Sequence, residues 1–144
     1  MAKIQEQIEL AKKLIDPLLA RTIVDDGDRS EGNAKLMKKS EGDAVMFQMK
    51  LKGKKPPSKE YFLALGALVE DNDSAAIRCD GCTALALHVL ATEKKFKGDL
   101  YIVEQGKGNA TGHWFVLAGK PTELKYGKDM GAGCFVIDLW GAYV

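Results

Sequence analysis

The sequence has little net charge and lacks a long hydrophobic run. Its 144 residues carry 21 Lys and Arg against 20 Asp and Glu, a formal net charge of +1. The net charge therefore creates no overall electrostatic field that would favour binding to nucleic acid or to an anionic membrane surface. No apolar run approaches the roughly 20 residues that would span a bilayer. We expect neither nucleic acid nor a membrane as a partner.

Cysteine is scarce as well. Cys79, Cys82 and Cys134 are an odd number without framework spacing, so a disulfide-stapled scaffold is not expected and a reducing cytosol is the easier environment. The N-terminus, MAKIQEQIEL, is polar and contains acids, so we expect no signal peptide on this chain. Internal repeats are missing too. The length and the 46% hydrophobic content then predict one soluble globular domain over residues 1–144.

The first third of the chain predicts a helix, a loop and a strand. Apolar residues recur at helical spacing over residues 3–20, and Pro17 is expected to kink or end that helix because proline cannot donate to the preceding turn. The run DDGDRSEGN (25–33) has the composition of a loop. Residues 44–52, AVMFQMKLK, place large apolar side chains at every second position. This period of two predicts a half-buried strand, with a helix as the alternative.

Two helices and a small sheet are predicted for the rest. Ser58 is a good N-cap for a helix over 59–71, and another helix is expected to run from Cys79 or Cys82 to Glu93. Three short β-rich runs separated by Gly and Lys loops then fit a small antiparallel sheet: 99–105, 113–119 and 134–140. With helices first and strands last, the predicted class is α+β, with N-terminal helices packed on the sheet.

Three chemical groups follow one another in a fixed order in the second half. A cysteine, Cys79 or Cys82, stands at a helix start, His113 opens a strand, and Asp138 closes the next one. A free thiol with a pKa of about 8.5 is mostly protonated at neutral pH, but a helix N-terminus and a neighbouring imidazole both favour the thiolate. A carboxylate would fix the tautomer of that imidazole. The order predicts a Cys-His-Asp catalytic core within 74–144, preceded by a mainly helical part, 1–73.

Each of these residues also has a more ordinary interpretation. A lone cysteine on a helix usually fills the core, and His88, further along the same helix, is expected to be a helix-face histidine. The C-x2-C spacing of Cys79 and Cys82 is also that of a zinc knuckle, but the second pair of ligands is missing. A thioredoxin-like motif would need a strand directly before the cysteines, where EDNDSAAIR offers only a short apolar stretch. We expect no metal and no cofactor.

The ordered trio resembles the papain-like and transglutaminase-like cysteine enzymes. It looks closest to the papain-fold toxin domains of bacterial polymorphic toxins and to related secreted effectors. RCDGCTALALHVL is similar to their cysteine helix, GHWFVLAG to their His-led strand, and CFVIDLWG to their strand ending in Asp-x-Trp. The resemblance covers residues 74–144. It implies a papain-like fold with His113 and Asp138 on adjacent strands and Trp140 beside the imidazole.

The resemblance leaves the choice of nucleophile open. Papain's own C-x2-C motif chooses the second cysteine, Cys82, with Asp80 as its N-cap. The pattern of the effector-type relatives chooses Cys79, although Gly81 in the first helical turn counts mildly against it. The balance leans narrowly to Cys79. The oxyanion hole would use the N–H of the nucleophile and an upstream donor, for which Asn72 is the guess.

The expected function is cysteine-dependent acyl transfer, by a protease or a protein glutamine deamidase acting as a bacterial toxin or effector domain. The resemblance implies a protein substrate, a cognate immunity protein, and delivery into the cytoplasm of a target cell. Transglutaminase-type cross-linking is an alternative, because an amine instead of water can resolve the thioester. The other alternative is a non-enzymatic protein-binding domain with inert cysteines.

Overall fold

A computed structural model describes residues 2–25, 30–51, 58–105, 113–120 and 133–143 of the chain. Within them it has five α-helices, one 3-10 helix and a three-stranded antiparallel sheet, which confirms the α+β class. In chain order the elements are α1 (Ala2–Ile15), η1 (Asp16–Ala20), α2 (Glu31–Lys50), α3 (Lys59–Glu70), α4 (Cys79–Thr92), β1 (Leu100–Gln105), β2 (His113–Gly119), β3 (Cys134–Ile137) and α5 (Leu139–Tyr143).

The first helix ends where proline predicts. α1 stops at Ile15, and Pro17 lies in the first turn of η1, where its missing N–H and fixed φ are tolerated. The predicted loop 25–33 is only partly borne out, because α2 already begins at Glu31. Ser30 is its N-cap, and its hydroxyl accepts a hydrogen bond from the Asn33 N–H at 3.2 Å. Residues 26–29 of that loop lie outside the described residues.

The predicted strand over 44–52 is wrong, because α2 continues through this segment to Lys50. Phe47 and Leu51, four residues apart, are buried on one side, as helical spacing requires. Val45 and Met49 are 61% and 69% exposed on another side. The apparent period of two therefore arose because two exposed apolar residues, Val45 and Met49, alternate with two core residues, Phe47 and Leu51.

The predicted starts of the next two helices are confirmed. The Ser58 hydroxyl accepts from the Tyr61 N–H at 3.1 Å and caps α3. α4 begins at Cys79, with Arg78 rather than Asp80 as its N-cap residue, and ends at Thr92. Glycine has a low helix propensity, but close packing explains why Gly81 stands in this first turn. A Cβ there would lie 2.9 Å from the Cβ of Ile77.

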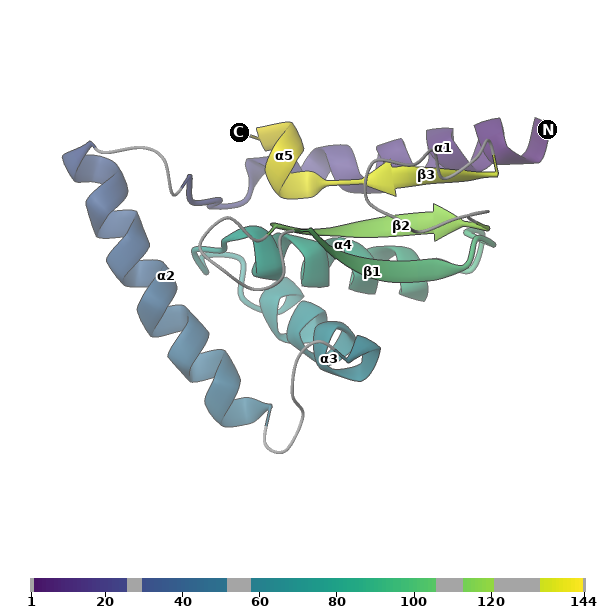
Figure 1. Cartoon of the computed structure of the whole chain (residues 1–144). Coiled ribbons are helices and arrows are strands. Elements are labelled where there is room, and N and C mark those ends of the chain that lie inside the picture. The colour runs from purple at the N-terminus through teal and green to yellow at the C-terminus, as the bar shows by residue number, and fades with distance from the viewer. Residues whose placement is uncertain (1, 26–29, 52–57, 106–112, 121–132, 144) are drawn as a thin grey trace.

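The sheet has the order β1-β2-β3, with Val116 opposite both Ile102 and Ile137. α4 packs on it along β2, α3 covers the other side of α4, and α2 extends away from this body (Figure 1). β3 is shorter than predicted, because the chain leaves the strand at Ile137 and α5 follows. No helix in the described ranges is long and apolar enough to cross a membrane.

Candidate active site

His113 and Asp138 meet at one end of the sheet. The His113 Nε2 atom lies 2.6 Å from Asp138 Oδ2, in a hydrogen bond that is also an ion pair when the ring is protonated. The two side chains are 22% and 28% exposed, so the pair is shielded but reaches solvent. β2 and β3 are antiparallel, and Asp138 directly follows β3 while His113 opens β2. The pairing that the sequence predicted for these two residues is therefore present.

The short helix α5 holds the Asp138 carboxylate in place. Its other oxygen, Oδ1, accepts a hydrogen bond from the Gly141 N–H at 2.8 Å, as an N-cap side chain does. A Cβ at Gly141 would lie 2.5 Å from Oδ2, so the absence of a side chain leaves room for the carboxylate. The two oxygens of one carboxylate thus have separate partners, one in α5 and one in the His113 ring.

Trp140 covers the imidazole, in the position that the resemblance implies. The Trp140 and His113 ring centroids are 5.2 Å apart, and the planes are tilted by 49°. The indole is fixed at its far side, because its Nε1–H donates to the Val24 carbonyl at 2.8 Å. Phe115 adds a second ring, 6.1 Å from that of His113. The imidazole is therefore restrained by aromatic contacts as well as by Asp138.

Cys79 and Cys82 lie in the first turn of α4, which points to the same end of the sheet. Figure 1 shows α4 and β2 beginning at the end where β3 finishes. The Thr83 hydroxyl donates to the Trp114 carbonyl at 2.9 Å and joins the first turn of α4 to the residue after His113. Cys79 is four residues before Thr83 and shares its helix face, which is the face that meets β2. Cys79 is partly exposed there.

Cys82 has a different environment. Its side chain is 0% exposed. Burial raises the pKa of the Cys82 thiol far above the usual range, and the negative charges of Cys79, Asp80 and Asp138 raise it further, against a smaller opposing effect of Arg21. The thiol is therefore protonated and shielded from solvent.

Several backbone groups around the first turn of α4 are already engaged. The Gly81 N–H donates to Asp80 Oδ1 at 2.8 Å, and the Cys82 N–H donates to the Arg78 carbonyl at 2.8 Å. Neither can serve as an oxyanion donor. Asn72, the guessed upstream donor, instead bonds the Leu68 carbonyl at the end of α3 through its Nδ2 atom. Its described hydrogen bonds join it to α3, Arg21 and Ala75 and not to the candidate site.

His88, predicted to be a helix-face histidine, contacts α3. Its Nε2 atom is 3.3 Å from Glu70 Oε2, an ion pair between α4 and α3 when the ring is protonated. Within the part of the chain that the structure describes, no group of three or more His, Cys, Asp or Glu side chains could hold a metal ion.

The N-terminal part contributes a support that the sequence analysis missed. Ile23 and Ile77 form a parallel bridge, in which the Val24 N–H donates to the Ile77 carbonyl at 2.8 Å and the Ile77 N–H donates to the Thr22 carbonyl at 2.9 Å. Val24 therefore bonds both Trp140, which covers His113, and the residue two before Cys79. A single bridge has no periodicity, so no signal in the sequence could have revealed it.

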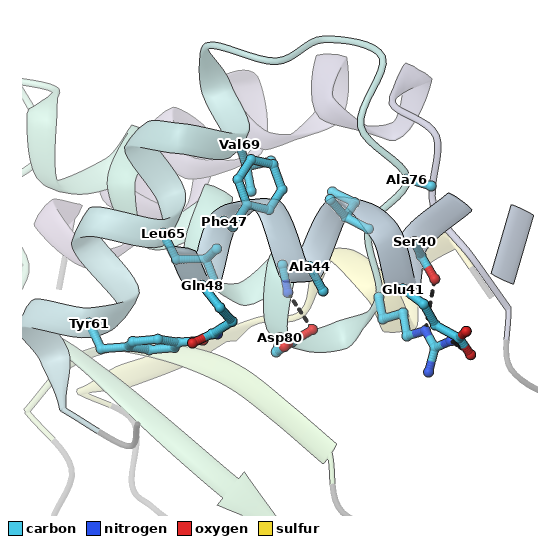
Figure 2. Close-up of a pocket in the computed structure, with 13 residues that line it drawn as sticks. Ser40, Glu41, Ala44, Phe47, Gln48, Tyr61, Leu65, Val69, Ala76 and Asp80 are labelled. Carbon is cyan, nitrogen blue, oxygen red and sulfur yellow. Dashed lines mark hydrogen bonds and ion pairs between the residues drawn. The ribbon is translucent and has the colours of Figure 1, made fainter. Parts of the chain in front are cut away.

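A cavity of about 190 Å³ lies on the other side of this region, between α2, α3 and residues 76–81 (Figure 2). Asp80 and Gly81 line it, whereas Cys79, His113 and Asp138 do not. Tyr61, which receives a hydrogen bond from Gln48, closes one end. The pKa of Tyr61 is raised by burial and by Asp80, against the effect of Gln48. This cavity belongs to the packing of α2 and is separate from the His113–Asp138 pair.

Comparison with known proteins finds no match among family models, curated proteins or solved structures. The assignment of chemistry to this chain therefore depends on its own residues and on the geometry described above.

Proposed function

We propose that the protein is a cysteine-dependent acyl-transfer enzyme, a hydrolase of amide bonds, with Cys79 as nucleophile, His113 as general base and acid, and Asp138 as the residue that orients the imidazole. The observation that carries the proposal is the 2.6 Å hydrogen bond from the His113 ring to Asp138 beside the first turn of α4. A histidine that opens a strand has no packing reason to bond a carboxylate there. Such a pair is the usual support of a catalytic base.

The hydrogen bond assigns the two ring nitrogens. An ionised carboxylate can only accept, so Nε2 of His113 carries the hydrogen in the bond to Asp138. Nδ1 is then the basic nitrogen that takes the thiol proton. Cys79 is the nucleophile rather than Cys82, because Cys79 is partly exposed at the start of a helix, whereas Cys82 is fully buried.

The reaction proceeds by two acyl transfers. The Cys79 thiolate attacks the amide carbonyl carbon, and the C–N bond breaks as the His113 imidazolium protonates the leaving nitrogen. The neutral imidazole then takes a proton from water, whose oxygen attacks the thioester and releases the Cys79 thiol and a carboxylic acid. A peptide bond as substrate gives proteolysis, and a glutamine side chain gives deamidation.

The class of substrate follows from the same proposal. The resemblance to toxin and effector enzymes supports a protein as the substrate, offered as an exposed loop or side chain. The resemblance to toxin and effector domains adds that the enzyme is delivered into a target cell, where its activity harms the host. A cognate immunity protein would then bind over the exposed edge of the His113–Asp138 pair.

The first test measures thiol reactivity without a substrate. Iodoacetamide at mildly acidic pH should label Cys79 fast and leave Cys82 unlabelled, because in the proposed mechanism His113 takes the proton of Cys79 only, and Cys82 is fully buried. His113→Ala should slow this labelling to the rate of an ordinary thiol. Cys134→Ala is the matched control and should leave the labelling of Cys79 unchanged. Equal, slow labelling of Cys79 in wild type and His113→Ala would favour the inert binding domain.

The second test separates the reactions. Purified protein is incubated with a denatured protein mixture, and peptide cleavage, ammonia release and incorporation of a fluorescent amine are followed in parallel. These readouts report proteolysis, deamidation and cross-linking respectively. Whichever reaction the wild type performs should be lost in Cys79→Ala and kept in Cys82→Ala. Expression in cells should be toxic for wild type and Cys134→Ala and harmless for Cys79→Ala at matched soluble levels.

A further inference from the structure

The two cysteines of α4 have the spacing of a pair that can form a disulfide, and they differ in solvent exposure. Cys79 and Cys82 are three residues apart in one α-helical turn, so their Cα atoms lie about 5 Å apart. Disulfides join Cα atoms roughly 4.4–6.8 Å apart. Cβ atoms at this spacing are about 5–6 Å apart and must approach by about 1 Å, so the bond requires a local shift of Cys79, the first residue of the helix.

The environments of the two sulfurs fix the order of events. Cys79 is partly exposed at the first residue of the helix, whereas Cys82 is fully buried one turn further in. An oxidant from solvent therefore meets Cys79 first. Cys82 can reach only a sulfur that is already on its own helix turn. Such a division into an attacking and a resolving cysteine is typical of C-x-x-C pairs at helix starts.

We propose that Cys79 and Cys82 form a reversible disulfide that closes off the sulfur of Cys79. The Cys79 thiolate attacks one sulfur of a small-molecule disulfide such as glutathione disulfide, and one thiolate leaves. Cys82 then attacks the Cys79 sulfur, and its proton passes to the second departing thiolate. Two protein thiols are oxidised, and one external disulfide is reduced to two thiols. A dithiol reductant reverses both steps.

The consequence for activity rests on the proposed function, whereas the disulfide itself does not. If Cys79 is the nucleophile, the oxidised protein is inactive, and the protein becomes active on entering a reducing compartment. If Cys79 has no catalytic role, the disulfide still forms, because its geometry depends only on α4. The test therefore detects the Cys79–Cys82 disulfide directly and measures enzymatic activity in a separate assay.

The experiment maps the bond by mass. The full chain is equilibrated in glutathione buffers with a rising share of glutathione disulfide, quenched in acid, alkylated and digested with trypsin. Cleavage after Arg78 and Lys94 puts both cysteines in the peptide 79–94, apart from Cys134. We expect this peptide to lose two hydrogens and both alkylation sites, and to regain them with dithiothreitol. Labelling of native Cys79 by iodoacetamide should fall to background in parallel.

Two variants sharpen the result. Cys82→Ala should hold a single glutathione on peptide 79–94, because the resolving sulfur is gone. Cys134→Ala should behave as wild type, since Cys134 opens β3 opposite Gly119, six residues and about 20 Å along β2 from His113. A wild-type peptide that keeps two free thiols or a glutathione adduct at every buffer ratio, or that links to Cys134, would overturn the proposal. If Cys82→Ala fails to fold, the masses of peptide 79–94 from the wild-type protein are sufficient to test the proposal.

Discussion

Asp138 shows how one residue combines a structural and a chemical contact. Its Oδ1 atom caps α5 through the Gly141 N–H, and its Oδ2 atom bonds His113. An N-cap is restrained by the helix that it begins, so the carboxylate meets the ring in one orientation. The position of the acid is therefore set by α5, which begins as soon as the chain leaves β3.

Gly141→Ala should disturb this arrangement. The added Cβ would lie 2.5 Å from Oδ2, so the carboxylate must move or α5 must shift. We expect a stability cost of about 1–3 kcal/mol, typical of overpacking. The His113–Asp138 bond should weaken, and nitrogen NMR of the imidazole should show loss of the single-tautomer signature. Labelling of Cys79 at mildly acidic pH should slow with it.

Gly42→Ala is the matched control. Gly42 lies within α2 with nothing inside 4 Å of an added Cβ, so the substitution should stabilise the protein by about 0.5–1 kcal/mol and leave the His113 spectrum unchanged. Denaturant unfolding measures both changes. A Gly141→Ala spectrum identical to wild type would show that the Asp138 carboxylate has more room than its contacts with Gly141 indicate.

At the scale of elements, the Ser58 capping signal predicted its helix correctly, whereas the period of two over 44–52 predicted the wrong element. Ser58 predicted the start of α3 because a cap is a local interaction between residues three apart. The period of two over 44–52 failed because Val45 and Met49 are apolar yet exposed, and no local rule separates them from the buried Phe47. The contact between His113 and Asp138 depends on the register of β2 and β3, which single-sequence patterns do not specify.

Buried apolar side chains and several polar contacts hold the helix α2 to the body, and one of the polar contacts makes its docking pH-dependent. Asp43 Oδ2 accepts from the Ala76 N–H at 2.9 Å and from Lys39 at 2.8 Å. Partial burial raises the pKa of Asp43, but these two hydrogen bonds outweigh it, so the pKa lies below its usual range. A carboxyl with a lowered folded-state pKa stabilises fully above its unfolded value, near 3.9.

Acid should therefore weaken the docking of α2. As pH falls through the lowered pKa of Asp43, the carboxylate is protonated and its bond to the Ala76 N–H is lost. The Ala76 amide proton should shift upfield in NMR with a midpoint below the ordinary aspartate value. In Asp43→Asn this titration should vanish. A midpoint at or above the ordinary value would contradict the hydrogen-bonded geometry.

At the scale of the whole molecule, residues 1–73 and residues 74–144 pack closely against each other. Gly66 of α3 crosses α4 so closely that a Cβ would lie 2.1 Å from the Ala84 carbonyl oxygen. The ring centroid of Phe62 is 5.1 Å from that of Trp114 on β2. Val24 bonds both Ile77 and Trp140. The residues proposed for chemistry all lie after residue 73, but the surfaces that fix them come from both parts.

The fragment 74–144 should therefore not fold alone. It would expose the surface that now covers four large buried side chains of α3: Tyr61, Phe62, Leu65 and Val69. Burial of each contributes about 1.5–3 kcal/mol. Their sum rivals the whole net stability of a small domain, about 5–15 kcal/mol. We expect a narrow amide NMR spectrum and no cooperative thermal transition, whereas the full chain should show both dispersion and a transition. A cooperatively melting fragment with a His113–Asp138 hydrogen bond would mean that the N-terminal helices are an addition to a self-sufficient core.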